Sequence, residues 1–384
     1  MNYLFTEEQE MIRDLARKIA VEKIAPVAAH YDETEEFPWP VMKVIADSDL
    51  FGVYIGEEYG GFGGGVTELA IVTEELSKAC GSIAVSYAAS ALGTYPIIIS
   101  GNEEQKKKYL PEIAAGKKLA AFGLTEANAG SDAGGIQTTA KKEGDYYILN
   151  GTKQWITNGG EAEIYSVVAI TDKSRGARGA SAFIVEKGTP GFSFGKKEKK
   201  MGIRSSATTD LIFENCKIPA ENLLGKEGHG FLVAMKTFDK SRPGVAAQAV
   251  GIAQGALDHA VKYSRERIQF DKPISSFQGI QFMLADMTTQ IEASRALVFA
   301  TARMVDSGEK NIAKASAMVK LFASDVAMKV TTDAVQIFGG YGYMREYPVE
   351  KYMRDAKITQ IYEGTNQIQR GVIAANLIKE SMKS

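Results

Sequence analysis

The short apolar runs that predict β-strands are confined to one stretch of this 384-residue chain, from about residue 119 to residue 230. Runs such as "YYILNGT" and "ASAFIVEK" recur there between glycine-rich and polar turns, which is the pattern of a small all-β domain, either a sandwich or a barrel. On both sides of this stretch the apolar residues follow helical spacing instead. Because strands do not alternate with helices along the chain, the pattern argues against a doubly wound parallel sheet. The sequence predicts a multidomain α+β protein with an N-terminal helical domain, a middle β domain and a C-terminal helical bundle, over residues 1–118, 119–230 and 231–384.

Apolar stripes indicate where the long helices lie. In the C-terminal third, apolar residues recur every three or four positions, which favours several amphipathic helices that bury one face in a bundle. The stripes consist of Val250, Ala253, Leu257 and Val261; of Ile280, Leu284, Met287, Ile291 and Val298; and of Val319, Phe322, Val326 and Val330. Near the N-terminus, Thr6 and Gln9 have capping-box spacing. We expect a helix to follow them with one apolar face, formed by Ile12, Leu15 and Ile19.

One uncharged segment, residues 79–102, is long enough to cross a bilayer. Gly81, Gly93, Pro96 and many hydroxyl groups interrupt it, so it is not continuously apolar. Membrane-spanning helices are more uniformly hydrophobic than this. The segment therefore predicts a buried helix or the wall of an apolar pocket, and no membrane span.

Charge and composition exclude several functional classes. The net charge of −2 provides no basic footprint for nucleic acid. The two cysteines, Cys80 and Cys216, are far apart, which fits a reducing compartment without disulfides. With only three histidines, no metal site is expected. The first residues lack the apolar core of a signal peptide, and this predicts a bacterial cytoplasmic location.

Two glycine-containing motifs fail when their context is considered. The stretch "YGGFGGG" (59–65) lacks GxGxxG spacing and a strand–turn–helix setting, so a Rossmann dinucleotide site is not expected. "GFSFG" (191–195) matches a nucleophile elbow around Ser193, but that motif requires an apolar helix directly after the serine. Here "KKEKKMG" follows, and an edge strand explains the glycines better.

Six stretches remain, and their common order along the chain carries a family resemblance. They are "FGLTEANAGSD" (122–132), "GTKQWITNGG" (151–160), "FDKSRPGVAAQAVG" (238–251), "SRERIQFDKPISSFQGIQF" (264–282), "AVQIFGGYGYMREYPVEKYMRD" (334–355) and "MRDAKITQIYEGTNQIQRGVI" (353–373). Together they resemble the acyl-CoA dehydrogenase family, closest to its short- and medium-chain, butyryl-CoA-type members. The resemblance covers essentially the whole chain and implies helical, β-barrel and four-helix-bundle domains in that order. It also implies FAD-dependent oxidation of an acyl-CoA to the trans-2-enoyl-CoA, with electrons passing to an electron-transferring flavoprotein.

Glu363 is the expected catalytic base. A thioester α-proton is weakly acidic, so its removal requires a base held in a dry pocket, where burial raises a carboxylate's pKa. Gly364 would let the backbone turn tightly and leave room for the substrate. In isolation a surface glutamate in a turn is the favoured interpretation, and the catalytic role follows from the resemblance. Some family members carry the base on the bundle helix instead, but that position is Ser241 here, which excludes the isovaleryl and long-chain types.

The resemblance also implies a flavin site. Thr125 and Thr157 would hydrogen-bond the isoalloxazine, and Trp155 would flank it; the alternative for Trp155 is a tryptophan in the core of the β domain. Gly130 and Ser131 would lie against phosphate and pantetheine groups, where small residues allow close approach. The neighbouring positions expected to contact FAD are Phe122, Leu124 and Ile156.

A second set of residues matches a cofactor site shared between subunits. By resemblance, a first group reaches the FAD adenosine of a neighbouring subunit, a second group lies on the other side of that shared site, and a third group follows the catalytic base and also contacts FAD. In that order, the three groups are Arg267, Gln269, Phe270 and Gln278; Gln336, Gly339 and Gly340; and Thr365 and Gln367. The resemblance thus implies an obligate oligomer, a homotetramer built as a dimer of dimers.

Substrate contacts are expected on three segments. Asp239 and Arg242 match CoA contacts, a role for which the guanidinium fork of arginine is suited. Tyr362 and the stretch 90–95 should line the acyl cavity, with Thr94 and Tyr95 where the family adjusts its depth. Ser131 and Gly364 complete the expected set.

Two further functions remain open from the sequence. The same residues could reduce an enoyl-CoA, or act on an alicyclic or aromatic acyl group. A catalytically idle acyl-CoA-binding protein is a third reading, against which the intact Glu363, Thr157 and Trp155 argue.

Overall fold

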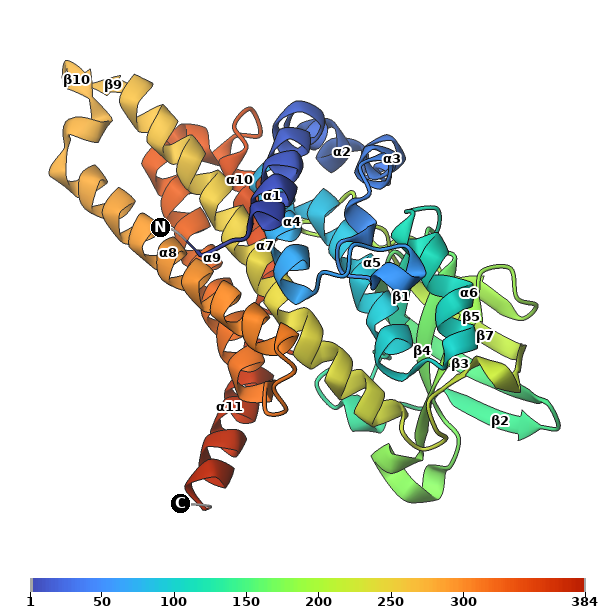
Figure 1. Ribbon diagram of the computed structural model, residues 1–384. Coiled ribbons are helices and arrows are strands. Elements are labelled where there is room, and N and C mark those ends of the chain that lie inside the picture. The colour runs from blue at the N-terminus through green and yellow to red at the C-terminus, as the bar shows by residue number, and fades with distance from the viewer. Residues whose placement is uncertain (1–2, 383–384) are drawn as a thin grey trace.

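The computed structural model describes residues 3–382. Figure 1 shows helices from both ends of the chain packed together, with the strands of the middle region set to one side. The N-terminal helices are α1 (Glu7–Ile19), α2 (Ala28–Thr34), α3 (Trp39–Asp47), α4 (Val66–Ala79), α5 (Gly81–Ser100) and α6 (Glu103–Ala114).

The predicted capping box of α1 is confirmed. The Thr6 side chain accepts a hydrogen bond from the Gln9 backbone, and the Gln9 side chain accepts one from the Thr6 backbone. The predicted apolar face is only partly right, because Leu15 is 40% exposed. The face that α1 buries contains Ala16 and Ile19.

The middle domain is an eight-stranded mixed sheet. Its strands are β1 (Ala120–Gly123), β2 (Thr139–Glu143), β3 (Tyr146–Thr157), β4 (Ile164–Ile170), β5 (Ala180–Glu186), β6 (Phe192–Phe194), β7 (Thr208–Pro219) and β8 (Leu223–Leu224). They are ordered β6-β7-β3-β2-β4-β5-β8, and β1 pairs in parallel with β4. The apolar runs correctly predicted β3 to β7, and β6 is the short strand preferred over a nucleophile elbow. The sequence missed β2 because its "TAKKE" is mostly charged and exposed.

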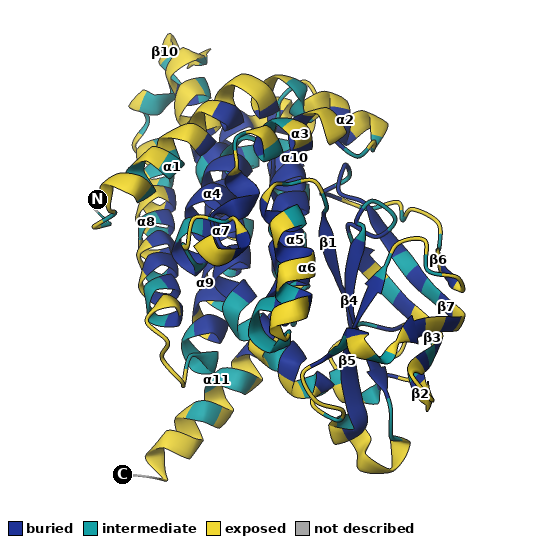
Figure 2. Ribbon diagram, turned by 45° about the vertical axis from the view of Figure 1, so that its right-hand side comes forward, coloured by how far each residue is buried: buried dark blue, intermediate teal, exposed yellow. Residues whose placement is uncertain are grey.

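The C-terminal third forms the helical bundle of α7 (Gly230–Glu266), α8 (Gln278–Asp306), α9 (Ala313–Phe338), α10 (Val349–Thr359) and α11 (Asn366–Ser381). A small hairpin of β9 (Ile268–Gln269) and β10 (Lys272–Pro273) joins α7 to α8. Helix α7 packs most extensively against α9 and α4, so it links the bundle to the N-terminal helices. Figure 2 shows these central helices as mostly buried. Two stripe residues were predicted wrongly, since Val261 and Phe322 are 37% and 41% exposed.

Helix α5 contains the uncharged segment and lies inside the protein. By length and composition it could cross a membrane, but 78% of its apolar window is buried in the fold. At Gly93 a Cβ would lie 2.4 Å from the Ala121 nitrogen, so α5 rests directly on β1. The Ser166 hydroxyl on β4 donates to the Gly93 carbonyl at 2.8 Å. This contact brings an apolar helix face next to the strands of the middle domain.

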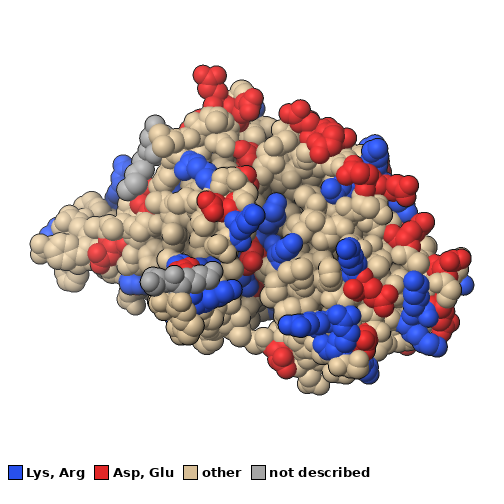
Figure 3. Space-filling model, turned by 60° about the horizontal axis from the view of Figure 1, so that its bottom comes forward, with Lys and Arg blue, Asp and Glu red and all other residues tan. Residues whose placement is uncertain are grey.

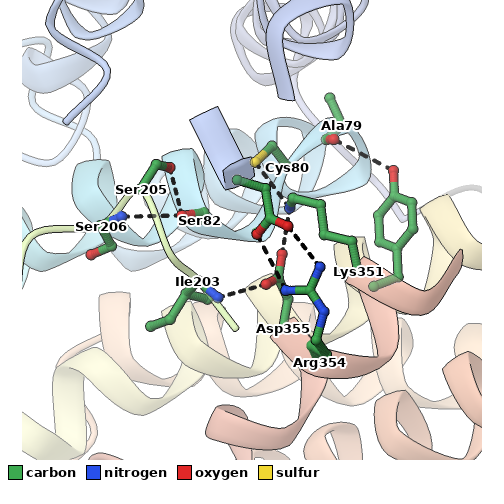
Figure 4. A network of polar contacts seen from close by, with 12 residues as sticks. Ala79, Cys80, Ser82, Ile203, Ser205, Ser206, Lys351, Arg354 and Asp355 are labelled. Atoms are coloured by element: carbon green, nitrogen blue, oxygen red, sulfur yellow. Dashed lines mark hydrogen bonds and ion pairs between the residues drawn. The ribbon is translucent and has the colours of Figure 1, made fainter. Parts of the chain in front are cut away.

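A buried polar network ties the parts of the chain together (Figure 4). Arg354 on α10 pairs with Asp32 at 2.6 Å and with Glu350 at 2.7 Å. The neighbouring Asp355 pairs with Lys351 at 2.6 Å and accepts the Ile203 backbone N–H at 2.6 Å. Because these partners come from the N-terminal, middle and C-terminal segments, the network fixes α10 against the other two regions.

Charges on the surface are mixed rather than segregated. Figure 3 shows acidic and basic side chains interspersed over one face, in keeping with the net charge of −2. Within residues 3–382, no group of three or more His, Cys, Asp or Glu side chains could hold a metal ion.

Candidate active site

A cavity of about 440 Å³ lies where α5, the middle sheet, α7 and the turn before α11 meet. One wall is apolar and comes from α4 and α5. Another part of the lining comes from the middle domain and includes most of the residues expected to contact the flavin. These two sets are Leu69, Val85, Ala88, Ala89, Leu92 and Tyr95, and Phe122, Leu124, Thr125, Gly130, Ser131, Trp155, Ile156 and Thr157.

Glu363 lies in this cavity, on a turn with an unusual backbone. Glu363 and Gly364 both have positive φ, +52° and +92°, a conformation that costs free energy for a non-glycine residue. The Gln369 side chain donates to both of their carbonyls, at 3.1 and 2.9 Å, and the Arg242 Nε donates to that of Glu363 at 3.5 Å. A Cβ on Gly364 would lie 2.7 Å from the Gln369 Nε2, so only glycine fits there without movement. The surrounding side chains therefore hold Glu363 in a geometry that it would not adopt alone.

The environment of the Glu363 carboxyl raises its pKa. Burial is the largest cause, and it is opposed by the Ser241 hydroxyl and by the charges of Arg242 and Lys320. The Ser241 hydroxyl donates directly to the Glu363 Oε2. A partly desolvated carboxylate with few compensating donors is a competent base near neutral pH.

Replacing Ser241 by alanine is expected to shift the acid limb of the activity–pH profile to higher pH. The hydroxyl stabilises the ionised form of Glu363, so its loss raises the pKa of that carboxyl further. At a pH below the plateau the variant should thus be slower than the wild type, while the two converge at high pH. The measurement is kcat/KM against pH, and a profile with an unmoved acid limb would contradict the expected role of the contact.

The flavin-side residues surround an exposed indole. Trp155 lies at a register shift of β3 with φ +59°, and 57% of the residue is exposed. Thr125 and Thr157 line the same cavity, as do the buried Phe122 and Leu124. Trp155 is therefore not a core tryptophan of the β domain. An open aromatic face between hydroxyl groups fits a flat heterocyclic ring.

A buried ion pair, which the sequence analysis did not predict, fixes the loop that carries the flavin-side residues. Lys153 is fully buried, and its Nζ lies 2.7 Å from the Glu126 Oε1 and 3.0 Å from the Leu124 carbonyl. The Glu126 carboxylate also accepts the backbone N–H groups of Gln137 and Thr138, at 2.6 and 2.9 Å. Burial lowers the pKa of Lys153 to about 8 and the Glu126 charge opposes this. Both residues lie in stretches that carry the family resemblance. Their opposite charges were the signal in the sequence that could have indicated an ion pair.

The residues expected at a shared FAD site divide into two groups. Arg267, Gln269, Gly339 and Gly340 line a second hollow of about 490 Å³ at the far end of the bundle, where the Arg267 guanidinium lies 5.3 Å from the Tyr341 ring centre. The other expected residues do not line it: Phe270 is 86% exposed, and Gln278 and Gln336 lie outside the hollow.

The two residues expected to contact FAD beside the base do not line the cavity. The Thr365 side chain caps the N-terminus of α11 by accepting the Ile368 N–H at 3.3 Å. Gln367 is exposed and does not line the cavity.

The expected substrate residues also divide. Tyr362, Gly364, Ser131, Tyr95 and Arg242 line the cavity. Asp239 does not line it and instead holds the Arg242 guanidinium at 3.1 Å.

The expectation for Thr94 needs correction. The Thr94 hydroxyl turns back to the Ser90 carbonyl at 2.6 Å, and the Ser90 hydroxyl accepts the Ala120 N–H at 3.0 Å. These two residues face β1 and their own helix, because successive helical positions point in different directions. The cavity-facing positions of α5 are Val85, Ala88, Ala89, Leu92 and Tyr95.

Comparison with known proteins gives the family. Three family models match the chain: the acyl-CoA dehydrogenase N-terminal domain over residues 6–117, the middle domain over 121–216 and the C-terminal domain over 228–378. The chain belongs to the acyl-CoA dehydrogenase family. It is therefore an oxidoreductase, and the predicted fold class and FAD as cofactor are confirmed.

Individual relatives are similar over their whole length. The acryloyl-CoA reductase (NADH) of Anaerotignum propionicum is 50% identical, with 99% of this chain and 96% of that protein covered. The solved structure of butyryl-CoA dehydrogenase from Megasphaera elsdenii is 50% identical with a TM-score of 0.96, and covers 98% of this chain and 100% of its own. A chain in a solved structure of the electron transferring flavoprotein of Acidaminococcus fermentans is 54% identical with a TM-score of 0.96, covering 98% of this chain and 99% of that chain.

The residues of this enzyme fit a bound FAD. Trp155, Thr125 and Thr157 would hold the ring system, and the observation behind this fit is an exposed tryptophan in a cavity that two threonines also line. A Cβ at Gly130 would meet nothing within 4 Å, which leaves open space beside the loop for a bulky group.

Proposed function

We propose that this enzyme oxidises a short-chain acyl-CoA to the trans-2-enoyl-CoA, with Glu363 as the base that removes the α-proton. The observation that carries the proposal is the position of Glu363, whose side chain shares one cavity with an apolar wall and with Trp155. A substrate between them would have its α-carbon facing the carboxylate and its β-carbon facing the ring system. Such positioning is the main contribution that a protein makes to this kind of reaction.

The turn that carries Glu363 also supplies a donor for the thioester oxygen. Among residues 3–382, no acceptor pairs with the Glu363 backbone N–H. A free N–H beside the base can stabilise the negative charge that develops on the carbonyl oxygen as the proton leaves. FAD, when bound, accepts the hydride from the β-carbon.

The shape of the cavity and the relatives support a short acyl chain. Leu92 and Tyr95 belong to the part of the cavity wall that α5 forms, and Tyr95 is a bulky, 2% exposed side chain there. The butyryl-CoA dehydrogenase of Megasphaera elsdenii acts on a four-carbon acyl group and is similar over the full chain. The test is anaerobic titration of the purified protein with acyl-CoAs of graded length, followed by flavin absorbance. Bleaching strongest with short chains is expected; no bleaching with any acyl-CoA would refute the proposal and leave only a binding role.

Electrons are proposed to leave through an electron-transferring flavoprotein. Support comes from the chain in the Acidaminococcus fermentans structure, which is 54% identical to this one. Reduced enzyme should be reoxidised rapidly by such a flavoprotein and slowly by oxygen.

The enzyme is also proposed to be a homotetramer, a dimer of dimers, in which FAD extends to a neighbouring subunit. Arg267 and the glycines Gly339 and Gly340 form an open hollow on the surface of the bundle. Exposed aromatic residues lie on the same bundle, with Phe270 at 86% and Phe282 at 60% exposure. A subunit that packs over this hollow would cover these side chains.

Arg267→Ala is expected to weaken FAD retention and the oligomer together. The loss of one charge-assisted contact corresponds to roughly a 10- to 100-fold weaker affinity. The measurements are the FAD-to-protein ratio after gel filtration and the mass by light scattering. Arg265→Ala, at an exposed position two residues earlier, serves as the matched control. An Arg267→Ala protein that retains both FAD and mass would contradict the shared site.

A second candidate, enoyl-CoA reduction by the same site, is favoured by one observation. The acryloyl-CoA reductase (NADH) of Anaerotignum propionicum is 50% identical over nearly the whole chain. Both directions use the same base and ring system, since the reverse reaction passes through the same transition state. Comparing rates with acyl-CoA and with 2-enoyl-CoA panels, including alicyclic and aromatic members, distinguishes the two physiological directions.

A further inference from the structure

Lys320 is a buried cation beneath the turn that carries Glu363. It lies on α9, and its side chain is completely inaccessible to solvent. Its Nζ donates to the Gly364 carbonyl at 2.8 Å and to the Asn366 Oδ1 at 2.9 Å. Among the described residues no carboxylate lies within 4.0 Å of this nitrogen, so both of its hydrogen-bond acceptors are neutral. An ammonium group without a paired carboxylate is costly to bury. Here the buried group holds the active-site turn in place, which offsets that cost in function.

The hydrogen bond from Lys320 is made to the part of the turn whose backbone conformation is least favourable. Gly364 follows Glu363 directly, and both residues have positive φ. The Gly364 carbonyl is fixed from two sides, by Lys320 and by the Gln369 amide. Asn366, the other acceptor of Lys320, is itself held by Asp325 at 2.7 Å. Lys320 therefore connects α9 to both ends of the short segment between Glu363 and α11.

The charge of Lys320 acts on Glu363 as well as on the backbone. Three charged groups act on the ammonium group from the elements packed against it: Glu363 on the turn, Arg242 on α7 and Asp325 on α9 itself. Asp239 on α7 and Arg370 on α11 pair with Arg242 and Asp325 respectively. Burial lowers the pKa of Lys320 to about 7, the Glu363 carboxylate opposes that change, and Arg242 adds to it. In return, the Lys320 charge lowers the pKa of Glu363.

We propose that Lys320 is a positioning residue for Glu363: its ammonium group holds the Gly364 carbonyl and supplies positive charge that keeps the Glu363 carboxylate ionised. The inference rests on the proposed role of Glu363 as the base. Lys320 does not line the cavity and acts through the turn and the charge of Glu363.

The test compares three variants by the pH profile of flavin reduction under single-turnover, anaerobic conditions. Lys320→Met removes the charge with little change of volume, Lys320→Arg keeps the charge, and Lys329→Met is the matched control on the exposed side of the same helix. Without the positive charge, Glu363 binds its proton more tightly, so the acid limb of Lys320→Met should move to higher pH by about one unit. Lys320→Arg and Lys329→Met should leave the acid limb in place or, for arginine, move it to lower pH.

Unfolding of the same proteins gives a readout independent of activity. In the unfolded chain Lys320 has its ordinary pKa of 10.5, above its value of about 7 in the fold. Between these values the unfolded chain binds one more proton, so this lysine makes stability rise with pH. The thermal midpoint of the wild type relative to Lys320→Met should thus increase from pH 7 to pH 10.

The outcomes separate this inference from the proposed function. A wild type that no acyl-CoA bleaches would refute the function itself. An active wild type whose acid limb coincides with that of Lys320→Met would overturn the role of Lys320 alone, whether the rate of the variant is reduced or unchanged.

Discussion

Replacing Glu363 by glutamine is expected to slow flavin reduction by acyl-CoA by about 10²–10⁴-fold, the usual cost of removing a general base. Glutamine has nearly the same size and can still accept the Ser241 hydrogen bond, so the turn and the cavity should persist. FAD content and the affinity for a CoA product are therefore expected to stay at wild-type values. The measurement is the single-turnover rate of bleaching, with both binding assays as controls. Unchanged turnover would remove Glu363 from the mechanism.

The contact between Ser241 and Glu363 allows a sharper version of this experiment. Because the Ser241 hydroxyl reaches the Glu363 carboxylate, a longer acid at position 241 should bring its own carboxylate to the same part of the cavity. The double substitution Ser241→Glu with Glu363→Gly should recover part of the lost rate. Glu363→Gly alone should not, which distinguishes a missing base from a collapsed site.

The second large effect is expected at the buried ion pair of the middle domain. Glu126→Ala would leave the Lys153 ammonium buried without its partner, at a cost of about 3–5 kcal/mol in the free energy of unfolding. It would also leave the N–H groups of Gln137 and Thr138 without their acceptor. Since this loop carries Thr125 and Ser131, FAD should be lost together with stability. Thermal unfolding and FAD content measure the two effects.

Two further variants control the Glu126 experiment. Glu143→Ala breaks the exposed pair with Lys141 on β2, and exposed pairs contribute about 0–1 kcal/mol. Replacing both members of the buried pair, as Glu126→Leu with Lys153→Met, should recover much of the stability because no charge is left unpaired. If Glu126→Ala and Glu143→Ala unfold at the same temperature, the buried pair does not have the assigned role.

The order of the three regions and most strands could be predicted because period and composition are local properties of the chain. The apolar runs of β3 to β7 are short and bounded by turns, and the capping box of α1 involves two residues three positions apart. The segments that meet at the cavity are distant in sequence, and only the resemblance brought Glu363, Trp155 and Thr157 together in advance.

The charged residues beneath the site could not be found in the same way. Lys320 and Lys153 each stand among apolar and polar neighbours where a lysine normally indicates a solvated face, yet both are fully buried. Their burial depends on acceptors supplied by distant segments, such as the Gly364 carbonyl and the Glu126 carboxylate. Thr94 was predicted wrongly for a related reason: a run of uncharged residues does not show which of its positions face the cavity.

The network around Arg354 and Asp355 has a consequence for how the enzyme becomes active. Helix α10, which carries both residues, ends at Thr359, and Glu363 follows on the next turn of chain. Helix α10 is held by an ion pair with Asp32 in the first region and by a hydrogen bond from the Ile203 backbone in the second, so its position is fixed only when all three regions have docked. In a chain that is still being synthesised or is partly unfolded, the Glu363 side chain therefore has no fixed orientation. Removal of the α-proton requires that all three regions have folded and docked.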